Sequence, residues 1–583
     1  MVLFRIFKKF NLILSRHQKL RIVQLAVLMV IGGLLETCSV SLILPFMDAV
    51  MNPEASMEKW YAQLFCRIFG LQIPRTYLTV LAMALAALYV AKNVYLVVEY
   101  NVQHRFVYGN MFALQERLLD TFIHRPYEYF LNVSSGDVVR IISTDTREAF
   151  ELLVELLSLL TELVVSLMLA IAIFVITPVI TLCIAALLLV IMLFIFVVLK
   201  PVLHRMGICQ QESAAGMNKW LLQSIQGIKE LKVMRKEQYF EESYNYYGKE
   251  YVRALRWKQT LSSVPRFIIE GVCMGAMFIV VAVLIDSGED LQAIIPMLTA
   301  VAMAAIRLLP SVNRVSGGLN RISYSEPMLD KVIENMRILE ENPAQTDVRE
   351  QSDLSVPKLQ EALNFERITY HYPGAEEPVL SGASMAIRRG ESVGIVGPSG
   401  AGKTTSVDII LGLLNPQGGR VLVDGVDIKN DLPTWLSQIG YIPQMIFMLD
   451  DTIRANVAFG VPERETDDEQ VWRALREAAL EEFVRSLPEG LDTQIGERGL
   501  RLSGGQRQRI GIARALYQNP EVLIFDEATS ALDSETESAI MESIHGLHGT
   551  KTMIIIAHRL TTIKACDRIF RVEHGQIKGE KTL

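Results

Sequence analysis

The chain has 583 residues, a mass of 65.5 kDa, 50% apolar residues and a mean hydropathy of +0.28, which leaves room for two or more domains and is high for a soluble enzyme. Its net charge of −7 comes without a run of basic residues, so nothing indicates a nucleic-acid partner. The six cysteines have no paired spacing and predict neither a disulfide framework nor a zinc site: Cys38, Cys66, Cys183, Cys209, Cys273 and Cys566.

Apolar stretches dominate the chain before residue 325. A helix that crosses a bilayer needs about 20 mostly apolar residues, and six stretches meet this requirement. The third and fourth are almost continuous across Thr177 and Pro178, which predicts a helical hairpin with a tight turn outside the membrane. We therefore expect a transmembrane domain over residues 1–325, with spans at about 22–50, 77–99, 152–177, 179–200, 264–285 and 292–316.

Charge around the first and last spans predicts their orientation. Six basic residues precede the first span, whereas residues 286–290, the last external loop, are acidic. The positive-inside rule then places the N-terminus in the cytoplasm, and an even number of spans returns the chain to the same side. The first apolar stretch is too long for a signal peptide and lacks a small-residue cleavage site, so we expect it to act as an anchor.

The segments between spans differ in length. About 52 residues separate the second and third spans and about 63 separate the fourth and fifth, which predicts two long helical extensions into the cytoplasm. Their tips are expected at 124–130 and 235–240. Polar residues with two prolines at 341–358 predict a linker, with outer bounds 326–359, before a second domain at 360–583.

The first motif of the second domain that indicates a binding site is a glycine-rich loop. It follows the apolar run 392–396 and precedes a helical pattern, giving the order strand, loop and helix. Glycines in this context turn backbone N–H groups onto a phosphate chain, Lys403 neutralises the outer phosphates and the Thr404 hydroxyl holds Mg²⁺. The predicted ATP-binding residues here are Gly397, Pro398, Ser399, Gly400, Ala401, Gly402, Lys403, Thr404 and Thr405.

Further motifs follow in a fixed order. Gln444 comes just after a strand-like segment, and a second apolar strand ends in Asp526 and Glu527, with Asp526 at 526 − 403 = 123 residues beyond Lys403. Asp526 is suited to order Mg²⁺ through water, and Glu527 to act as the general base that polarises the attacking water. A third strand ends in His558, expected to donate to the γ-phosphate. The motif Leu-Ser-Gly-Gly-Gln lies between Gln444 and Asp526. It supplies the further predicted ATP-binding residues Ser503, Gly504, Gly505 and Gln506, and Asp533, after the two carboxylates, is also predicted to bind ATP.

These motifs together resemble the nucleotide-binding domain of ATP-binding-cassette (ABC) transporters, over roughly residues 360 to 577. The resemblance implies that Tyr372 stacks on adenine and that Gln444 contacts the metal and the water where this domain meets the membrane domain. It also implies that Ser503 and Gly505 contact the γ-phosphate held by another subunit, so that two chains enclose each ATP. A turn aromatic at Tyr372 and a helix cap at Asp533 remain the structural alternatives.

The resemblance extends to exporters with two long cytoplasmic loops. In that class a short coupling helix at each loop tip docks onto a nucleotide-binding domain, which gives 124–130 and 235–240 a role. The alternative is a pair of solvated amphipathic helices that do not dock.

Cargo information comes from charged residues inside the predicted spans, where ionisable groups are costly and usually face a cavity or a partner. Lys92 and Arg307 are cationic and lie within spans two and six, and Arg266 lies near the cytoplasmic end of span five, four residues before Glu270. If part of this positive charge is unpaired, the cavity favours an anionic group such as a phosphate or pyrophosphate. For Lys92 and Arg307 the alternative is neutralisation across helices by the acidic residues Glu36, Glu155, Glu162 and Glu270. For Arg266 snorkelling or an intrahelical pair with Glu270 is the favoured alternative.

Between the first two spans, apolar residues recur at helical spacing from Met57 to Leu71, including Trp60, Leu64 and Ile68. This pattern predicts an interfacial helix on the outer leaflet. A short ordered loop packed on the spans is the alternative.

Several membrane segments look like those of bacterial lipid-linked oligosaccharide flippases of the PglK type. The cargo of that family is a polyprenyl pyrophosphate that carries a sugar chain, which agrees with the cationic residues at Lys92, Arg266 and Arg307. The segments that carry this resemblance are Gly33-Leu34-Leu35-Glu36, Leu44-Pro45-Phe46, Gly227-Ile228-Lys229-Glu230, Pro265-Arg266 with Glu270, and Arg307-Leu308-Leu309-Pro310-Ser311 with Asn313-Arg314.

The sequence thus predicts a multi-domain membrane protein, with a six-helix transmembrane domain and long cytoplasmic helical extensions followed by an α/β P-loop ABC nucleotide-binding domain. The expected function is that of a homodimeric ATP-driven flippase, bound to ATP and Mg²⁺ and acting on lipid-linked oligosaccharide in the bacterial inner membrane. An exporter of another amphipathic cargo (lipid, drug or peptide) is the first alternative. An ATP-gated channel is the second, and the presence of both Glu527 and His558 disfavours it.

Overall fold

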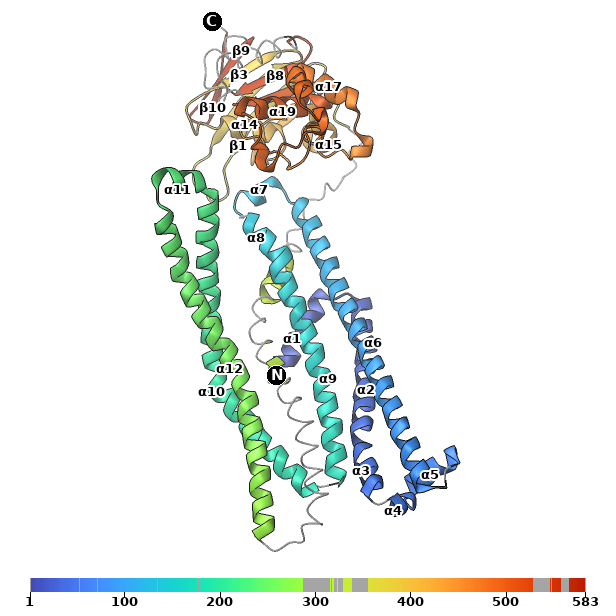
Figure 1. Cartoon of the computed structure of the whole chain (residues 1–583). Helices are drawn as coiled ribbons and strands as arrows, with labels where there is room; N and C mark the ends of the chain where they lie inside the picture. Colours follow the sequence, from blue (N-terminus) through green and yellow to red (C-terminus); the bar gives the residue numbers. More distant parts are fainter. Residues whose placement is uncertain are drawn as a thin grey trace. The chain divides into compact units, whose positions relative to one another are not determined.

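A computed structural model of the chain divides into two compact units (Figure 1). The first unit comprises Met1–Ile123 and Ser134–Pro343, and the second comprises His124–Val133 and Ala344–Leu583. The structure describes residues 2–51, 53–70, 72–133, 135–176, 178–286, 315, 317–318, 322, 329–337, 355–527, 546, 548–556 and 566–581.

The first unit is helical over its described residues. Long helices α6, α10 and α12 each extend over about 50 residues, which at 1.5 Å per residue is far longer than a bilayer core needs. In chain order its helices are α1 (Val2–Ile13), α2 (Arg16–Ser41), α3 (Ile43–Met51), α4 (Pro53–Met57), α5 (Trp60–Phe69), α6 (Pro74–Ile123), α8 (Ser135–Val139), η1 (Arg140–Asp145), α9 (Thr146–Ile176), α10 (Pro178–Gln226), α11 (Ile228–Met234) and α12 (Glu237–Asp286).

Two described segments are long and apolar enough to cross a membrane, Arg16–Ser39 and Pro74–Ile123. They coincide with the first two predicted spans. The third predicted span falls within α9 up to Ile176, and the fourth and fifth fall within α10 and α12. Helix α10 begins at Pro178, because a proline suits the first position of a helix. The sixth span, 292–316, lies outside the described residues except for residue 315. The six crossings remain a prediction.

The segment after the first span forms the predicted helix, α5. Its outer face exposes Trp60, Leu64 and Ile68, whereas Ala62 is buried against Tyr77 of α6. The helix ends at Gly70, which adopts the left-handed conformation (φ +67°) and donates its backbone N–H to the carbonyl of Cys66. The position of α5 at a membrane interface remains a prediction.

The second unit is an α/β domain built on two sheets. The larger sheet has the order β10-β9-β3-β8-β7-β6, with all neighbouring strands parallel except the β10–β9 pair. Strands β7 and β8 are apolar and buried, as expected for the centre of a parallel sheet. The bounds are β3 (Ser392–Val396), β6 (Ile439–Ile442), β7 (Val522–Asp526), β8 (Thr552–Ile556), β9 (Arg568–Glu573) and β10 (Gln576–Lys581).

A smaller antiparallel sheet, with the order β2-β1-β4-β5, covers part of the same core. Trp435 is fully buried in this core, and its indole N–H donates to the carbonyl of Ile410 at 2.8 Å. The remaining strands are β1 (Ala362–Tyr370), β2 (Leu380–Arg388), β4 (Gly418–Val423) and β5 (Val426–Asp427); the helices are α7 (Tyr127–Phe130), α14 (Lys403–Ile410), α15 (Leu432–Leu436), α16 (Ile453–Val457), α17 (Asp468–Glu477), α18 (Glu481–Ser486) and α19 (Gly504–Tyr517).

The unit boundaries differ from the sequence-based ones in two places. Residues 355–359, expected in the linker, pack into the second unit, because Val356 and Leu359 are buried and the Gln438 side chain bonds to the backbone of Pro357 and Leu359. Residues 329–337, also inside the expected linker, are helical. Residues 124–133, expected in the first domain, belong to the second unit.

Candidate nucleotide-binding site

The parallel sheet brings most of the predicted site to one edge. Strands β3, β8, β7 and β6 are neighbours in that order, so their carboxyl ends meet on the same side, which is where α/β sheets bind ligands. Gly397 follows β3, Glu527 follows β7 and Gln444 follows β6. His558 comes two residues after the end of β8 and lies outside the described residues, as does Asp533.

The glycine loop needs its glycines for space and for backbone conformation. A Cβ on Gly397 would lie 2.3 Å from the carbonyl oxygen of Val572, which is a backbone atom and cannot move aside. Gly400 and Gly402 have φ of +79° and +104°, which disfavours other residues. The loop leads directly into α14, whose first residue is Lys403, so free backbone N–H groups face the loop.

Lys403 is buried within the loop. Its ammonium donates to the carbonyl oxygens of Gly397 at 2.9 Å and Pro398 at 3.0 Å. Thr404, the next residue, is exposed in the first turn of α14. A cation held by neutral carbonyls at a helix N-terminus fits a phosphate chain, because both the ammonium and the N–H groups favour negative charge there.

Asp526 ends β7 and is only 4% exposed. Burial, and then the charge of Glu527, raise the pKa of Asp526 to about 6, while Lys403 and a hydrogen bond from Tyr441 act in the opposite direction. A hard divalent cation would stabilise such a crowded, buried carboxylate. Its oxygen, with those of Thr404 and Gln444, therefore fits Mg²⁺, a cation that takes oxygen ligands.

Glu527 is held in an uncommon backbone conformation. Its φ is +49°, and its N–H donates to the carbonyl of Ile556 at the end of β8 at 3.0 Å. The Gln444 amide donates to the Glu527 carboxylate at 2.7 Å. A non-glycine residue with positive φ costs free energy and is typical of functional sites. Strands β7 and β8 thus fix the Glu527 carboxylate at the sheet edge, and the Gln444 amide, which follows β6, orients it.

Tyr372 lies just beyond β1. Its hydroxyl is 3.0 Å from the Thr405 hydroxyl, and its ring contacts Tyr370 edge to face, with centroids 5.1 Å apart. The side chain is therefore fixed beside α14, the helix that follows the glycine loop. A partly exposed aromatic ring at this position suits stacking on a base.

The Leu-Ser-Gly-Gly-Gln motif forms the start of α19. Ser503 caps this helix in a reciprocal capping box, in which its hydroxyl accepts from the Gln506 N–H and the Gln506 side chain accepts from the Ser503 N–H. Gly504 and Gly505 occupy the first turn. Ser503 is exposed, so this helix N-terminus is available to an anion outside the chain's own fold.

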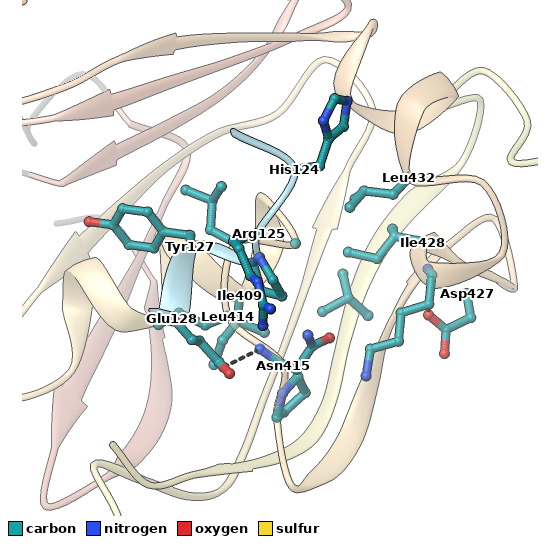
Figure 2. Close-up of a pocket in the computed structure, with 16 residues that line it drawn as sticks. His124, Arg125, Tyr127, Glu128, Ile409, Leu414, Asn415, Asp427, Ile428 and Leu432 are labelled. Carbon is teal, nitrogen blue, oxygen red and sulfur yellow. Dashed lines mark hydrogen bonds between the residues drawn. The ribbon is translucent and has the colours of Figure 1, made fainter. Parts of the chain in front are cut away.

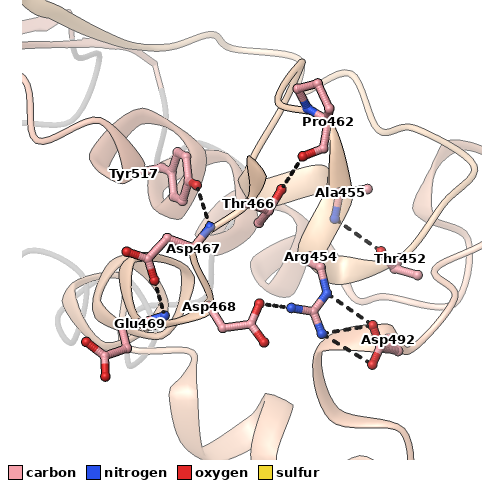
Figure 3. A network of polar contacts seen from close by, with 10 residues as sticks. All are labelled: Thr452, Arg454, Ala455, Pro462, Thr466, Asp467, Asp468, Glu469, Asp492 and Tyr517. Atoms are coloured by element: carbon pink, nitrogen blue, oxygen red, sulfur yellow. Dashed lines mark hydrogen bonds and ion pairs between the residues drawn. The ribbon is translucent and has the colours of Figure 1, made fainter. Parts of the chain in front are cut away.

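A network around Arg454 holds the helices that support α19 (Figure 3). The Arg454 guanidinium bonds to the carboxylate of Asp492 at 3.0 to 3.3 Å and also pairs with Asp468 at the start of α17. The next contact leads to α19, because the Asp467 N–H donates to the hydroxyl of Tyr517 at 3.4 Å. The network therefore connects α16, α17 and the last turn of α19.

Three residues of this region were not predicted from sequence. Tyr441 donates to Asp526, and burial and Asp526 together raise the pKa of Asp408 to about 6. Glu128 contacts the domain from residues 124–133. Asp408 and Tyr441 carry no signal of their own in the sequence, whereas Glu128 lies in the tip 124–130 that was expected to dock onto a nucleotide-binding domain.

The structure places only part of the predicted cargo site. Lys92 is buried in α6, 7% exposed, with its ammonium 4.7 Å from the centre of the Tyr89 ring. Arg266 falls within α12, but its side chain is not described, and Arg307 lies outside the described residues. Proximity among the three cations therefore remains a prediction.

Two known families match consecutive parts of the chain. Residues 23–305 match the family described as "ABC transporter transmembrane region", and residues 380–530 match "ABC transporter". Together with the geometry of the sheet edge, these matches show that the chain belongs to the ABC transporters. It has the fused membrane and ATP-binding domains of an exporter, and the predicted fold class is confirmed.

Curated relatives include several flippases. An "ATP-dependent lipid A-core flippase" from Cupriavidus pinatubonensis is 45% identical over 222 residues, which is 38% of each chain. A protein of the same name from Dechloromonas aromatica is 32% identical over 373 residues, 64% of this chain and 62% of the relative. A "Toxin RTX-I translocation ATP-binding protein" from Actinobacillus pleuropneumoniae is 44% identical over 228 residues, 39% of this chain and 32% of the relative. These matches thus span less than two thirds of each relative's length.

A solved structure covers nearly the whole chain. The bacterial Atm1-family ABC exporter with ATP bound has a TM-score of 0.69 over 97% of this chain and 96% of its own, at 23% identity. At this identity the likeness concerns the fold alone.

Proposed function

We propose that the chain is an ATP-driven flippase, which acts as a homodimer in the bacterial inner membrane and moves a lipid-linked oligosaccharide of the polyprenyl-pyrophosphate class. The observation that carries the ATP-hydrolysing part is the Glu527 carboxylate, fixed at the end of β7 and held at 2.7 Å by the Gln444 amide. A fixed carboxylate beside a phosphate-binding loop is what water activation requires.

The residues of the sheet edge divide the chemistry among them. Lys403 and the N–H groups at the start of α14 bind the phosphate chain of ATP, while Thr404, Gln444 and Asp526 hold Mg²⁺. When bound, Mg²⁺ neutralises charge on the phosphate oxygens. Glu527 orients the attacking water and accepts its proton, and Gln444 keeps the carboxylate aimed at that water. His558 donates a hydrogen bond to the γ-phosphate.

A second copy completes each ATP site in this proposal. The exposed N-terminus of α19, with Ser503, Gly504, Gly505 and Gln506, binds the γ-phosphate held by the glycine loop of the partner. Asp533 contributes to the same dimer-enclosed site. Each dimer therefore encloses two ATP molecules, and closure and reopening around them drive alternating access.

The cargo assignment rests on charge inside the membrane half. Lys92 is buried in a helix that is apolar enough to cross a bilayer, where a cation is costly unless it serves a partner. With Arg266 and Arg307 it provides cations suited to a pyrophosphate. The relatives named as lipid A-core flippases favour an amphipathic lipid as cargo, and they make a lipid of another class the second candidate.

The test is a cargo comparison in proteoliposomes that contain the purified full-length chain. We expect ATP-dependent movement of a polyprenyl-pyrophosphate oligosaccharide, and at least tenfold slower movement of the same glycan on an uncharged polyprenol, because a charge-assisted contact is worth about 1.5 to 3 kcal/mol. Movement of lipid A-core instead of the polyprenyl cargo would establish the second candidate. Movement of cargo down its gradient with ATP bound and hydrolysis blocked would identify a gated channel.

A further inference from the structure

Residues 124–133 pack into the nucleotide-binding domain as part of the second unit. They form the short helix α7, which follows Pro126, and they line a cavity together with the loop after α14 and Val421 of β4. Figure 2 shows this region, where a cavity of about 670 Å³ is lined by residues of both segments. One of these side chains contacts both the backbone of the domain and a buried tyrosine.

That side chain is Glu128. One carboxylate oxygen accepts the backbone N–H of Asn415 at 2.9 Å (Figure 2) and lies 3.5 Å from the hydroxyl of Tyr370. Tyr370 is fully buried at the end of β1, and a buried tyrosine hydroxyl usually requires a partner. Burial and the nearby Glu128 charge raise the pKa of Tyr370, so its hydroxyl stays protonated and donates.

The contact continues toward the glycine loop. The Tyr370 ring meets Tyr372 edge to face, at 5.1 Å between centroids and an interplanar angle of 85°. The Tyr372 hydroxyl in turn lies 3.0 Å from the hydroxyl of Thr405 in α14. Four side chains, from Glu128 to Thr405, therefore form a continuous series of contacts, which we call the tyrosine relay: Glu128, Tyr370, Tyr372 and Thr405.

We propose that Glu128 is a positioning residue for the base side of the ATP site. It fixes the Tyr370 ring, which fixes Tyr372 at the angle needed to stack on adenine, so the affinity for ATP depends on the contact made by residues 124–133. Because such coupling is reciprocal, base binding also favours the docked form of this segment, which is covalently continuous with α6. The inference rests on the proposed function in one respect, the stacking of adenine on Tyr372.

The experiment measures equilibrium binding of Mg-ATP and of Mg-tripolyphosphate, which lacks the base, to the purified full-length chain. In Glu128→Ala we expect ATP to bind about three- to tenfold more weakly, the worth of one or two hydrogen bonds, with tripolyphosphate binding unchanged. Glu128→Gln keeps an oxygen acceptor for both donors and restores ATP binding to within about twofold. Glu116→Ala removes an exposed carboxylate of α6 and leaves both affinities unchanged.

A second variant tests the path of the effect. Tyr370→Phe keeps the buried ring but removes the hydroxyl, so it should weaken ATP binding by a smaller factor, and the Glu128→Ala, Tyr370→Phe double variant should resemble Glu128→Ala alone. Unchanged ATP affinity in Glu128→Ala, or an equal loss for ATP and tripolyphosphate, would overturn the proposal. Tyr372→Ala distinguishes a failure of the relay from a failure of the proposed adenine site. Unchanged ATP binding in that variant would mean that adenine does not stack on Tyr372.

Discussion

The two units use buried charge in different ways. In the nucleotide-binding domain the buried Lys403 starts α14 and the buried Asp526 ends β7, and Gln444 reaches Glu527 across 83 residues of sequence. In the membrane half two of the described buried charges have local partners, since Lys92 lies over the Tyr89 ring and Glu99 accepts from Gln103 four residues away. Residues brought together from distant parts of the sequence indicate the reaction at the sheet edge. The locally paired charges of the membrane half do not indicate which ligand binds there, so the cargo has to be found by experiment.

The largest effect is expected from a change of Glu527, the predicted general base of the ATP site. Glu527→Gln keeps the hydrogen bond to Gln444 possible but removes the base, so we expect the ATPase rate to fall about 10²- to 10³-fold with ATP binding retained. Phosphate release and nucleotide binding measure the two quantities. Glu521→Gln, a change just before β7, is the matched control and should keep the rate within about twofold. A Glu527→Gln rate above one tenth of wild type would disprove its role as base.

A second change breaks the phosphate loop through its backbone. Gly397→Ala places a methyl group 2.3 Å from the Val572 carbonyl oxygen, so the loop must move and we expect ATP affinity to fall at least about tenfold. Gly109→Ala adds the same methyl group where no heavy atom lies within 4 Å and should leave affinity unchanged. Wild-type affinity in Gly397→Ala would show that the loop tolerates the shift.

Neutralising the candidate cations of the membrane half tests whether they contact the cargo. Arg307→Ala and, separately, Lys92→Met should slow flipping by about tenfold and leave basal ATPase nearly unchanged, because a charge-assisted contact to cargo is lost. Arg105→Met removes an exposed cation from α6 and is the control. Equal loss of flipping and ATPase activity would count against a cargo contact and favour a structural role.

The smallest expected effect concerns the support of α19. Arg454→Ala removes a side chain that is 19% exposed and paired with two carboxylates, so the nucleotide-binding domain should lose about 1 to 2 kcal/mol and its melting temperature should fall by several degrees. Arg464→Ala removes an arginine that is 85% exposed and should change the melting temperature little. An equal fall of the melting temperature in both variants would show that the Arg454 network does not stabilise the domain more than an exposed arginine does.

Sequence reasoning succeeded where function depends on local backbone form. The glycine loop and the apolar strand before Asp526 and Glu527 each need particular residues at fixed spacing, and the structure has the expected strand or helix at each of them. The fold class followed from the same motifs. The contacts of Tyr441 with Asp526 and of Glu128 with Asn415 join segments far apart in the chain. Docking of the tip 124–130 was expected, but no spacing predicts which residues pair.

The bounds of the two compact units also depend on contacts between distant segments. Residues 355–359 look like linker because they end a mostly polar stretch and contain Pro357, yet the side chain of Gln438, about 80 residues further on, bonds to their backbone. Residues 124–133 continue a helical extension in sequence, but their contacts assign them to the other unit. A boundary depends on which surfaces pack together, and composition reports this only indirectly.

The central claim is that hydrolysis at the sheet edge drives movement of an anionic lipid-linked glycan. The most direct test compares wild type with Glu527→Gln in proteoliposomes that contain a polyprenyl-pyrophosphate oligosaccharide and ATP. The account predicts movement against the glycan gradient by wild type and none by the variant, although the variant still binds ATP. Movement of this cargo by Glu527→Gln at the wild-type rate, or none by a wild-type chain with full ATPase activity, would contradict it.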